Sequence, residues 1–171
     1  MALVLDGNGT MTVGNGDITG LAAGALPSNV IGAGAVLQVV SAVTSTEVTT
    51  ALATYVDTGL SASITPTSSS SKILVILSHG SNEKTNGSGN NRLYLKLLRG
   101  STDLAIFGNG LLYTATALVN RGSASFNYLD SPATTSSVTY KTQFTNGDAG
   151  ASVQVQTNNS PSSITLMEIA A

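Results

Sequence analysis

His79 is the single histidine of this 171-residue chain, so any Ser-His-Asp arrangement would have to use it as the base. The chain contains no Gly-x-Ser-x-Gly elbow to supply the nucleophile. A polar interval rich in Gly, Asn and Ser follows at residues 80–91. Because such clusters form exposed loops, we expect His79 to lie on the surface and to have no catalytic role.

Carboxylates are the second group that could do chemistry. Two acids are enough for glycoside hydrolysis when they face one cleft about 5 to 9.5 Å apart, and Glu83, Asp103 and Asp130 are the candidates. Asp103 and Asp130 stand near Gly and Pro, where Asp is a common turn residue. We therefore expect turns there, and a small glycan depolymerase is the least favoured hypothesis.

Metal and cofactor sites are poorly supported. One histidine and no cysteine leave few ligands for a transition metal. Residues 6–9 and 14–17 resemble parts of calcium loops but lack the full ligand set. The dinucleotide-type glycine patterns that begin at Gly14 and Gly32 end on Thr19 and Leu37 instead of glycine or alanine. We expect turns at these places, no metal and no cofactor.

The composition favours strands and turns over exposed helices. Apolar residues make up 42% of the chain and charged residues 9%, against roughly 25% charged residues in typical soluble domains. No Lys or Arg precedes Lys72, and no dense basic tract follows it, so we do not expect nucleic-acid binding. The chain has neither a membrane-length apolar stretch nor a basic leader, which predicts a protein made in the cytoplasm and kept off membranes.

The chain divides into two parts that differ in residue composition and pattern. Residues 1–34 contain eight glycines and no aromatic residue, which indicates an extended arm without a core of its own. Residues 35–171 consist of short runs rich in Val, Ile, Leu, Thr and Tyr between turn residues, which predicts an all-β, jelly-roll-like antiparallel β-sandwich. We expect strands at residues 36–46, 51–58, 62–65, 71–78, 92–99, 104–107, 111–119, 124–129, 137–144, 151–156 and 163–169. A helix at 47–53 is the weaker alternative for that segment.

Alternation of apolar and polar residues assigns faces to several strands. In 163–169, Ile164, Leu166 and Glu168 share one face. The continuous apolar run within 72–77 predicts a strand that is central in its sheet and covered on both sides. The aromatic faces of Phe126 with Tyr128, and of Val138 with Tyr140, should belong to the core or to an interface between subunits.

Several strings of the chain resemble virion proteins of tailed bacteriophages. Residues 2–10 (ALVLDGNGT) and 13–21 (VGNGDITGL) are similar to the leaders of such proteins. The body resembles a β-sandwich module at the ends of phage fibre and decoration proteins through residues 55–60 (YVDTGL), 64–66 (ITP), 71–75 (SKILV), 128–132 (YLDSP), 139–141 (TYK) and 163–169 (SITLMEI). None of these strings is a catalytic motif.

The resemblance implies a homotrimer on the exterior of a capsid or tail. Its arm would bind a major capsid protein or a tail or fibre protein, and the apolar arm residues for this contact are Leu3, Leu5, Met11, Val13, Ile18 and Leu21. We favour a capsid decoration (cement) protein, because an arm of about 35 residues spans at most roughly 125 Å and leaves no room for a shaft.

The alternative is a short tail-fibre or receptor-binding protein that recognises host surface glycans. In that case exposed loops at residues 80–91 and 108–110 would make the contacts. The residues expected to lie exposed in or beside these loops are His79, Glu83, Lys84, Asn90 and Asn109.

Overall fold

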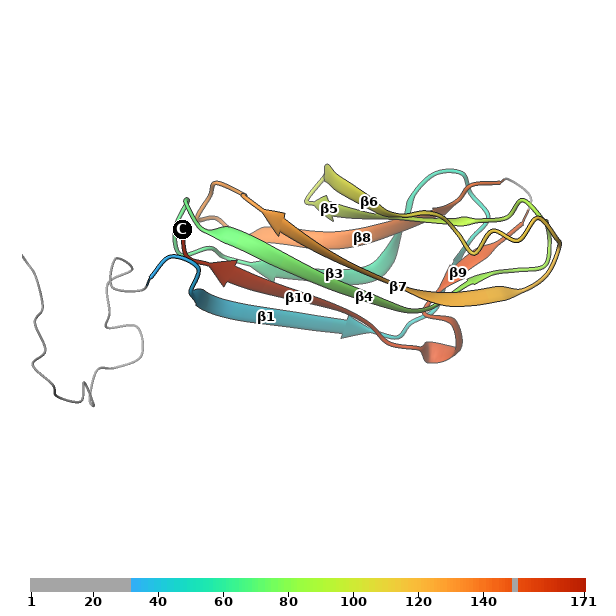
Figure 1. Ribbon diagram of the computed structural model, residues 1–171, viewed down its shortest axis with the longest axis horizontal. Helices are drawn as coiled ribbons and strands as arrows, with labels where there is room; N and C mark the ends of the chain where they lie inside the picture. Colours follow the sequence, from blue (N-terminus) through green and yellow to red (C-terminus); the bar gives the residue numbers. More distant parts are fainter. Residues whose placement is uncertain (1–31, 149–150) are drawn as a thin grey trace, which may run out of the picture. The chain divides into compact units, whose positions relative to one another are not determined.

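A computed structural model describes residues 32–148 and 151–171, which fold into ten β-strands and one short 3-10 segment (Figure 1). The elements are β1 (Val36–Thr44), β2 (Val48–Thr50), β3 (Val56–Ile64), β4 (Lys72–Lys84), β5 (Leu93–Arg99), β6 (Thr102–Leu111), β7 (Asn120–Asp130), β8 (Val138–Asn146), β9 (Val153–Val155), η1 (Thr157–Asn159) and β10 (Ser162–Ile169). They form two antiparallel sheets packed face to face, so the predicted β-sandwich is confirmed.

The 13-residue strand β4 is the spine of the six-stranded sheet. Along one side β4 pairs with β7, and along the other side it pairs first with β10 and then with β9. Strand β1 continues the sheet beyond β10, and β2 continues it beyond β9. The second sheet has four strands in the order β3-β8-β5-β6. The central position predicted for residues 72–77 is therefore confirmed.

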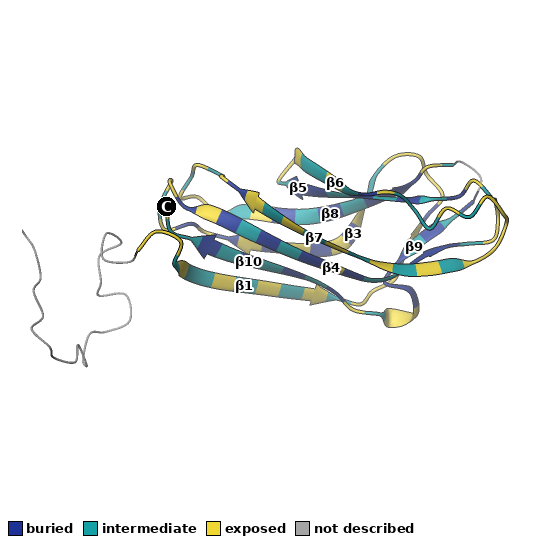
Figure 2. Ribbon diagram, viewed as in Figure 1, coloured by how far each residue is buried: buried dark blue, intermediate teal, exposed yellow. Residues whose placement is uncertain are grey.

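The core lies between the sheets and follows strict alternation. From β4, Ile73, Val75 and Leu77 point inward and are fully buried or nearly so. Alternating bands of burial along β4 and β10 are visible in Figure 2. The four-stranded sheet contributes inward side chains such as Leu97, Tyr140 and Phe144. Phe126, Tyr128 and Val138 pack against this core, so the predicted aromatic faces do belong to it.

Several sequence-based expectations about elements are wrong. Residues 108–110, expected as an exposed loop, belong to β6, and Asp103 and Asp130, expected in turns, belong to β6 and β7. Residues 80–84 belong to β4, because Glu83 and Lys84 pair with both β7 and β9. Residues 112–119 form no strand, since Leu112 and Ala115 adopt left-handed backbone conformations with φ of 67° and 57°. In residues 47–58 the structure has neither a helix nor one long strand, but β2, an irregular stretch at 51–55, and the start of β3.

Glu168 lies on the inward face of β10, as its alternation with Ile164 and Leu166 predicts. Gln38 donates to its carboxylate at 2.6 Å, and the backbone N–H and hydroxyl of Thr67 donate at 2.8 and 2.7 Å. Burial alone would raise the pKa of Glu168, but the hydrogen bonds from Gln38 and Thr67 outweigh it and hold the pKa below its ordinary value. The buried carboxylate thus connects β1 and the 65–71 loop to β10.

Candidate functional site

The two ends of the sandwich differ in what they carry. At one end, Gly34 and Ala35 hydrogen-bond to Ala170 just beyond β10, so the chain enters the domain beside the end of its last strand. Strand β4 runs from this end to the other, where Lys84 is its last residue. The loops 85–92 and 112–119 lie at that far end (Figure 1), which we call the loop end.

Lys84 links the two loops of the loop end through hydrogen bonds. Its side chain is fully buried, and its ammonium group donates to the carbonyls of Ser88 (3.4 Å), Gly89 (3.3 Å) and Thr116 (3.0 Å) and to Thr114 Oγ1 (2.5 Å). None of these four partners is a carboxylate, so the charge is balanced by backbone and hydroxyl dipoles. Burying an ammonium ion is favourable only when its donors are all satisfied, and this cage of acceptors meets that requirement.

The two loops that meet at Lys84 are packed closely. A Cβ added to Gly89 would lie 2.8 Å from the carbonyl oxygen of Ala115, so glycine is needed where the loops touch. The 112–119 loop turns its larger apolar side chains outward, and Tyr113, Leu118 and Val119 are 49%, 44% and 47% exposed. The loop end therefore presents an apolar surface, and the backbone of its two loops is hydrogen-bonded to the buried Lys84 ammonium group.

His79 lies in the core, so the expectation of a surface histidine is wrong. It continues the inward face of Ile73, Val75 and Leu77 along β4. Its Nε2 is 3.1 Å from Thr142 Oγ1, its ring lies 5.8 Å from that of Phe107, and its Nδ1 has no hydrogen-bond partner. Burial lowers the pKa of His79 to about 4, because the charged form would lose its hydration.

The carboxylates proposed for glycan hydrolysis are each engaged in a separate ion pair. Glu83 binds Arg121 on the neighbouring strand β7. Asp103 binds Lys96 at 2.9 Å on the four-stranded sheet. Asp130 at the end of β7 accepts from Arg99 at 2.7 Å and from the Tyr140 hydroxyl at 2.7 Å. The structure does not bring these three acids together in one described cleft.

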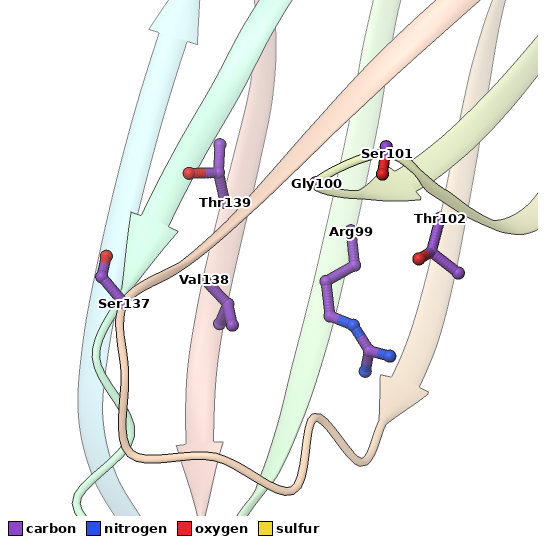
Figure 3. A pocket seen from close by; sticks show the side chains of 7 residues that line it. All are labelled: Arg99, Gly100, Ser101, Thr102, Ser137, Val138 and Thr139. Carbon is purple, nitrogen blue, oxygen red and sulfur yellow. The ribbon is translucent and has the colours of Figure 1, made fainter.

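Arg99 also lines an open hollow of about 390 Å³ at the end opposite Lys84 (Figure 3). The hollow is formed by the β5–β6 turn and the start of β8, which the Gly100 N–H joins by donating to the Thr139 carbonyl at 2.8 Å. Its lining offers the hydroxyls of Ser101, Thr102, Ser137 and Thr139. The lining thus combines these hydroxyls with the apolar Val138 and one cation, and the guanidinium is already paired with Asp130.

Of the five residues expected to lie exposed in or beside the loops, two are exposed and three are buried. Asn90 and Asn109 are exposed, as expected. His79, Glu83 and Lys84 are buried, which corrects the expectation of exposure. The period-two continuation of β4 beyond Leu77 would have placed His79 inward, but nothing in the local pattern signals a buried lysine. The arm residues Leu3, Leu5, Met11, Val13, Ile18 and Leu21 lie outside the described residues.

No family model and no curated protein matches this chain. Within residues 32–148 and 151–171, no group of three or more His, Cys, Asp or Glu side chains is arranged to hold a metal ion. The described part of the chain also has no helix long and apolar enough to cross a membrane.

Protonation of His79 should make the fold less stable in acid. The folded-state pKa of about 4 lies below the ordinary value of 6.5, so the stability from keeping the ring neutral is complete above pH 6.5 and decreases as pH falls. Between pH 7 and pH 4 we expect the free energy of unfolding to decrease by about 3 kcal/mol from this group. His79→Leu should reduce the pH dependence by that amount in urea unfolding, and an unchanged dependence would contradict the assignment.

Removing the Lys84 ammonium should loosen the loop end. In Lys84→Met the carbonyls of Gly89 and Thr116 lose their charged donor, so we expect a loss on the order of 2 kcal/mol in urea unfolding and faster hydrogen exchange in residues 85–91 and 112–119. Lys72→Met is the matched control, because Lys72 is an exposed lysine at the other end of β4. Equal effects of the two substitutions would contradict the role given to Lys84.

Proposed function

We propose that this protein is a non-enzymatic virion structural protein of a tailed bacteriophage. It would be a homotrimeric capsid decoration protein, attached to the major capsid protein through the arm of residues 1–34. In this role it acts by binding alone. The exterior of the capsid is its place of action.

The observation that carries the proposal is the opposite placement of chain entry and loop end. Residues 32–35 enter the sandwich at the end where β10 finishes, and the loops fastened by Lys84 lie at the far end. A chain anchored through residues before Gly32 would then project its sandwich outward by the length of β4. The arm suits such an anchor by composition, because a glycine-rich segment without positive charge can follow a groove or add a strand to a sheet edge.

Deletion of the arm tests the proposal directly. We expect a chain lacking residues 2–31 to keep the folded sandwich, because the described core lies within residues 36–169 and the Gly34–Ala170 contact is retained. This chain should no longer co-sediment with capsids from which the protein has been stripped, whereas the full chain should. The arm fused to an unrelated monomeric protein is the complementary sample and should bind. Capsid binding by the chain without its arm would contradict the proposal.

One observation favours the alternative of a receptor-binding protein for host surface glycans. Tyr113 is about half exposed on the 112–119 loop, and an exposed aromatic ring on a braced loop is a suitable platform for a sugar. Phe107, the aromatic residue that precedes residues 108–110 on β6, packs against the core and does not share this role.

Binding to glycans of the host surface checks this alternative. Tyr113→Ala should weaken binding of the protein to host cells by about two- to tenfold if the ring packs on a sugar, since packing on an aromatic face contributes roughly 0.5 to 1.5 kcal/mol. Leu52→Ala is the control, because Leu52 is an exposed apolar residue outside the loop. Absence of cell binding by the unsubstituted protein would exclude the alternative.

A further inference from the structure

The outer face of the six-stranded sheet carries an apolar band that crosses four strands in register. Val39 pairs with Met167, Met167 with Leu74, and Leu74 with Leu129. All four side chains point away from the core, because Val40, Leu166, Val75 and Tyr128 in the adjacent register positions point inward. Val39 and Leu129 at the two sides are 55% and 52% exposed.

Further apolar side chains extend this band on the same face. Ile76 follows Leu74 along β4, Ile169 lies on the neighbouring strand β10, and Val36 and Val43 lie on β1 beyond β10. Of these, Val43 and Val36 are 65% and 53% exposed. We call this set the outer apolar face; its members are Val36, Val39, Val43, Leu74, Ile76, Leu129, Met167 and Ile169. The remaining outward positions in these rows are the polar residues Ser41, Lys72, Ser78, Ser125, Asn127, Ser163 and Thr165.

The four-stranded sheet has a different outer face. On β3 and β8 its outward positions carry Asp57, Ser61, Ser63, Thr139, Lys141 and Gln143, and Lys141 and Gln143 both bind Asp57. On the neighbouring strands Lys96 binds Asp103, and Ile106 beside Lys96 is a single exposed apolar residue. Polar and charged side chains of this kind are typical of a face in water, whereas a continuous apolar band is typical of a contact surface. This contrast indicates that the outer face of the six-stranded sheet, and not that of the four-stranded sheet, is a contact surface.

We propose that the outer apolar face is the interface between copies of this chain. Within its described rows Lys72 is the one charged residue, and it lies at the margin, so the face has no charge pattern that would select a different, oppositely charged partner. Two copies related by a two-fold axis can bring one apolar band against the other, so the face is self-complementary.

The size of the face agrees with this occupant. Four strands about 4.8 Å apart and eight residues at about 3.3 Å each give a flat area of roughly 500 Å² per copy. Two copies would bury roughly 1,000 Å² in total, which is about the lower limit for a specific interface. A face that meets itself gives a two-fold contact, which is a different contact from the three-fold one of the proposed homotrimer. The inference therefore goes beyond the proposed function, stands on the sheet geometry and does not require a phage particle.

Paired substitutions in sedimentation velocity test the interface. We expect the full chain to sediment as an oligomer, and Val39→Glu/Leu129→Glu to sediment as a folded monomer. Ile106→Glu is the matched control, because Ile106 is 59% exposed on β6, an edge strand of the other sheet, and should leave the oligomer intact. A monomeric full chain, or an oligomer that survives the double substitution, would overturn the inference.

Cross-linking covers the case in which the double variant does not fold. The chain has no cysteine, so Met167→Cys places one thiol in the apolar band and Ile106→Cys places one on the other sheet. A short bifunctional thiol reagent should link chains through Cys at 167 and not through Cys at 106, and equal linking would contradict the interface. An oligomer that ignores capsids would contradict the capsid attachment in the proposed function and leave this inference standing. A monomer that binds capsids would contradict this inference and the proposed homotrimer, and leave the capsid attachment standing.

Discussion

Strand β4 is the constraint on which the rest of the structure depends. It lies in the middle of the six-stranded sheet, with β7 on one side and β10 and β9 on the other. A strand in that position must present side chains to both faces of the sheet, and its apolar run does so with Ile73, Val75 and Leu77 inward and Leu74 and Ile76 outward. The inner set builds the core, and the outer set leaves an apolar face on one copy.

The same strand organises the buried polar groups. His79 continues its inward face, and Lys84 ends it inside a cage of carbonyl and hydroxyl oxygens. Between them a register shift against β7 and the left-handed Ser81 change the alternation, so that Asn82, Glu83 and Lys84 are all buried. The hydrogen bonds of these polar residues therefore fix the positions of the loops 85–92 and 112–119 at the loop end.

These features give the domain three distinct surfaces. Chain entry lies at one end, the braced loops lie at the other, and the outer apolar face lies along the side between them. A projecting virion protein would use all three, with the arm for anchoring, the side for assembly and the loop end facing away from the particle. A single-copy binding domain would have no use for the apolar side, and this difference connects the proposed function to the proposed interface.

The sequence by itself determined the fold class, the central position of β4 and the inward faces of β8 and β10, because period-two alternation and turn residues are local signals. It also determined the low charge and the lack of cysteine. Only the tertiary structure decided that the polar segment 79–84 is buried, because the partners that satisfy Lys84 come from loops up to about 30 residues away in the chain. The in-register apolar band was likewise invisible, since its four residues come from strands that are neighbours in space but not in sequence, and register is a property of pairing rather than of any one strand.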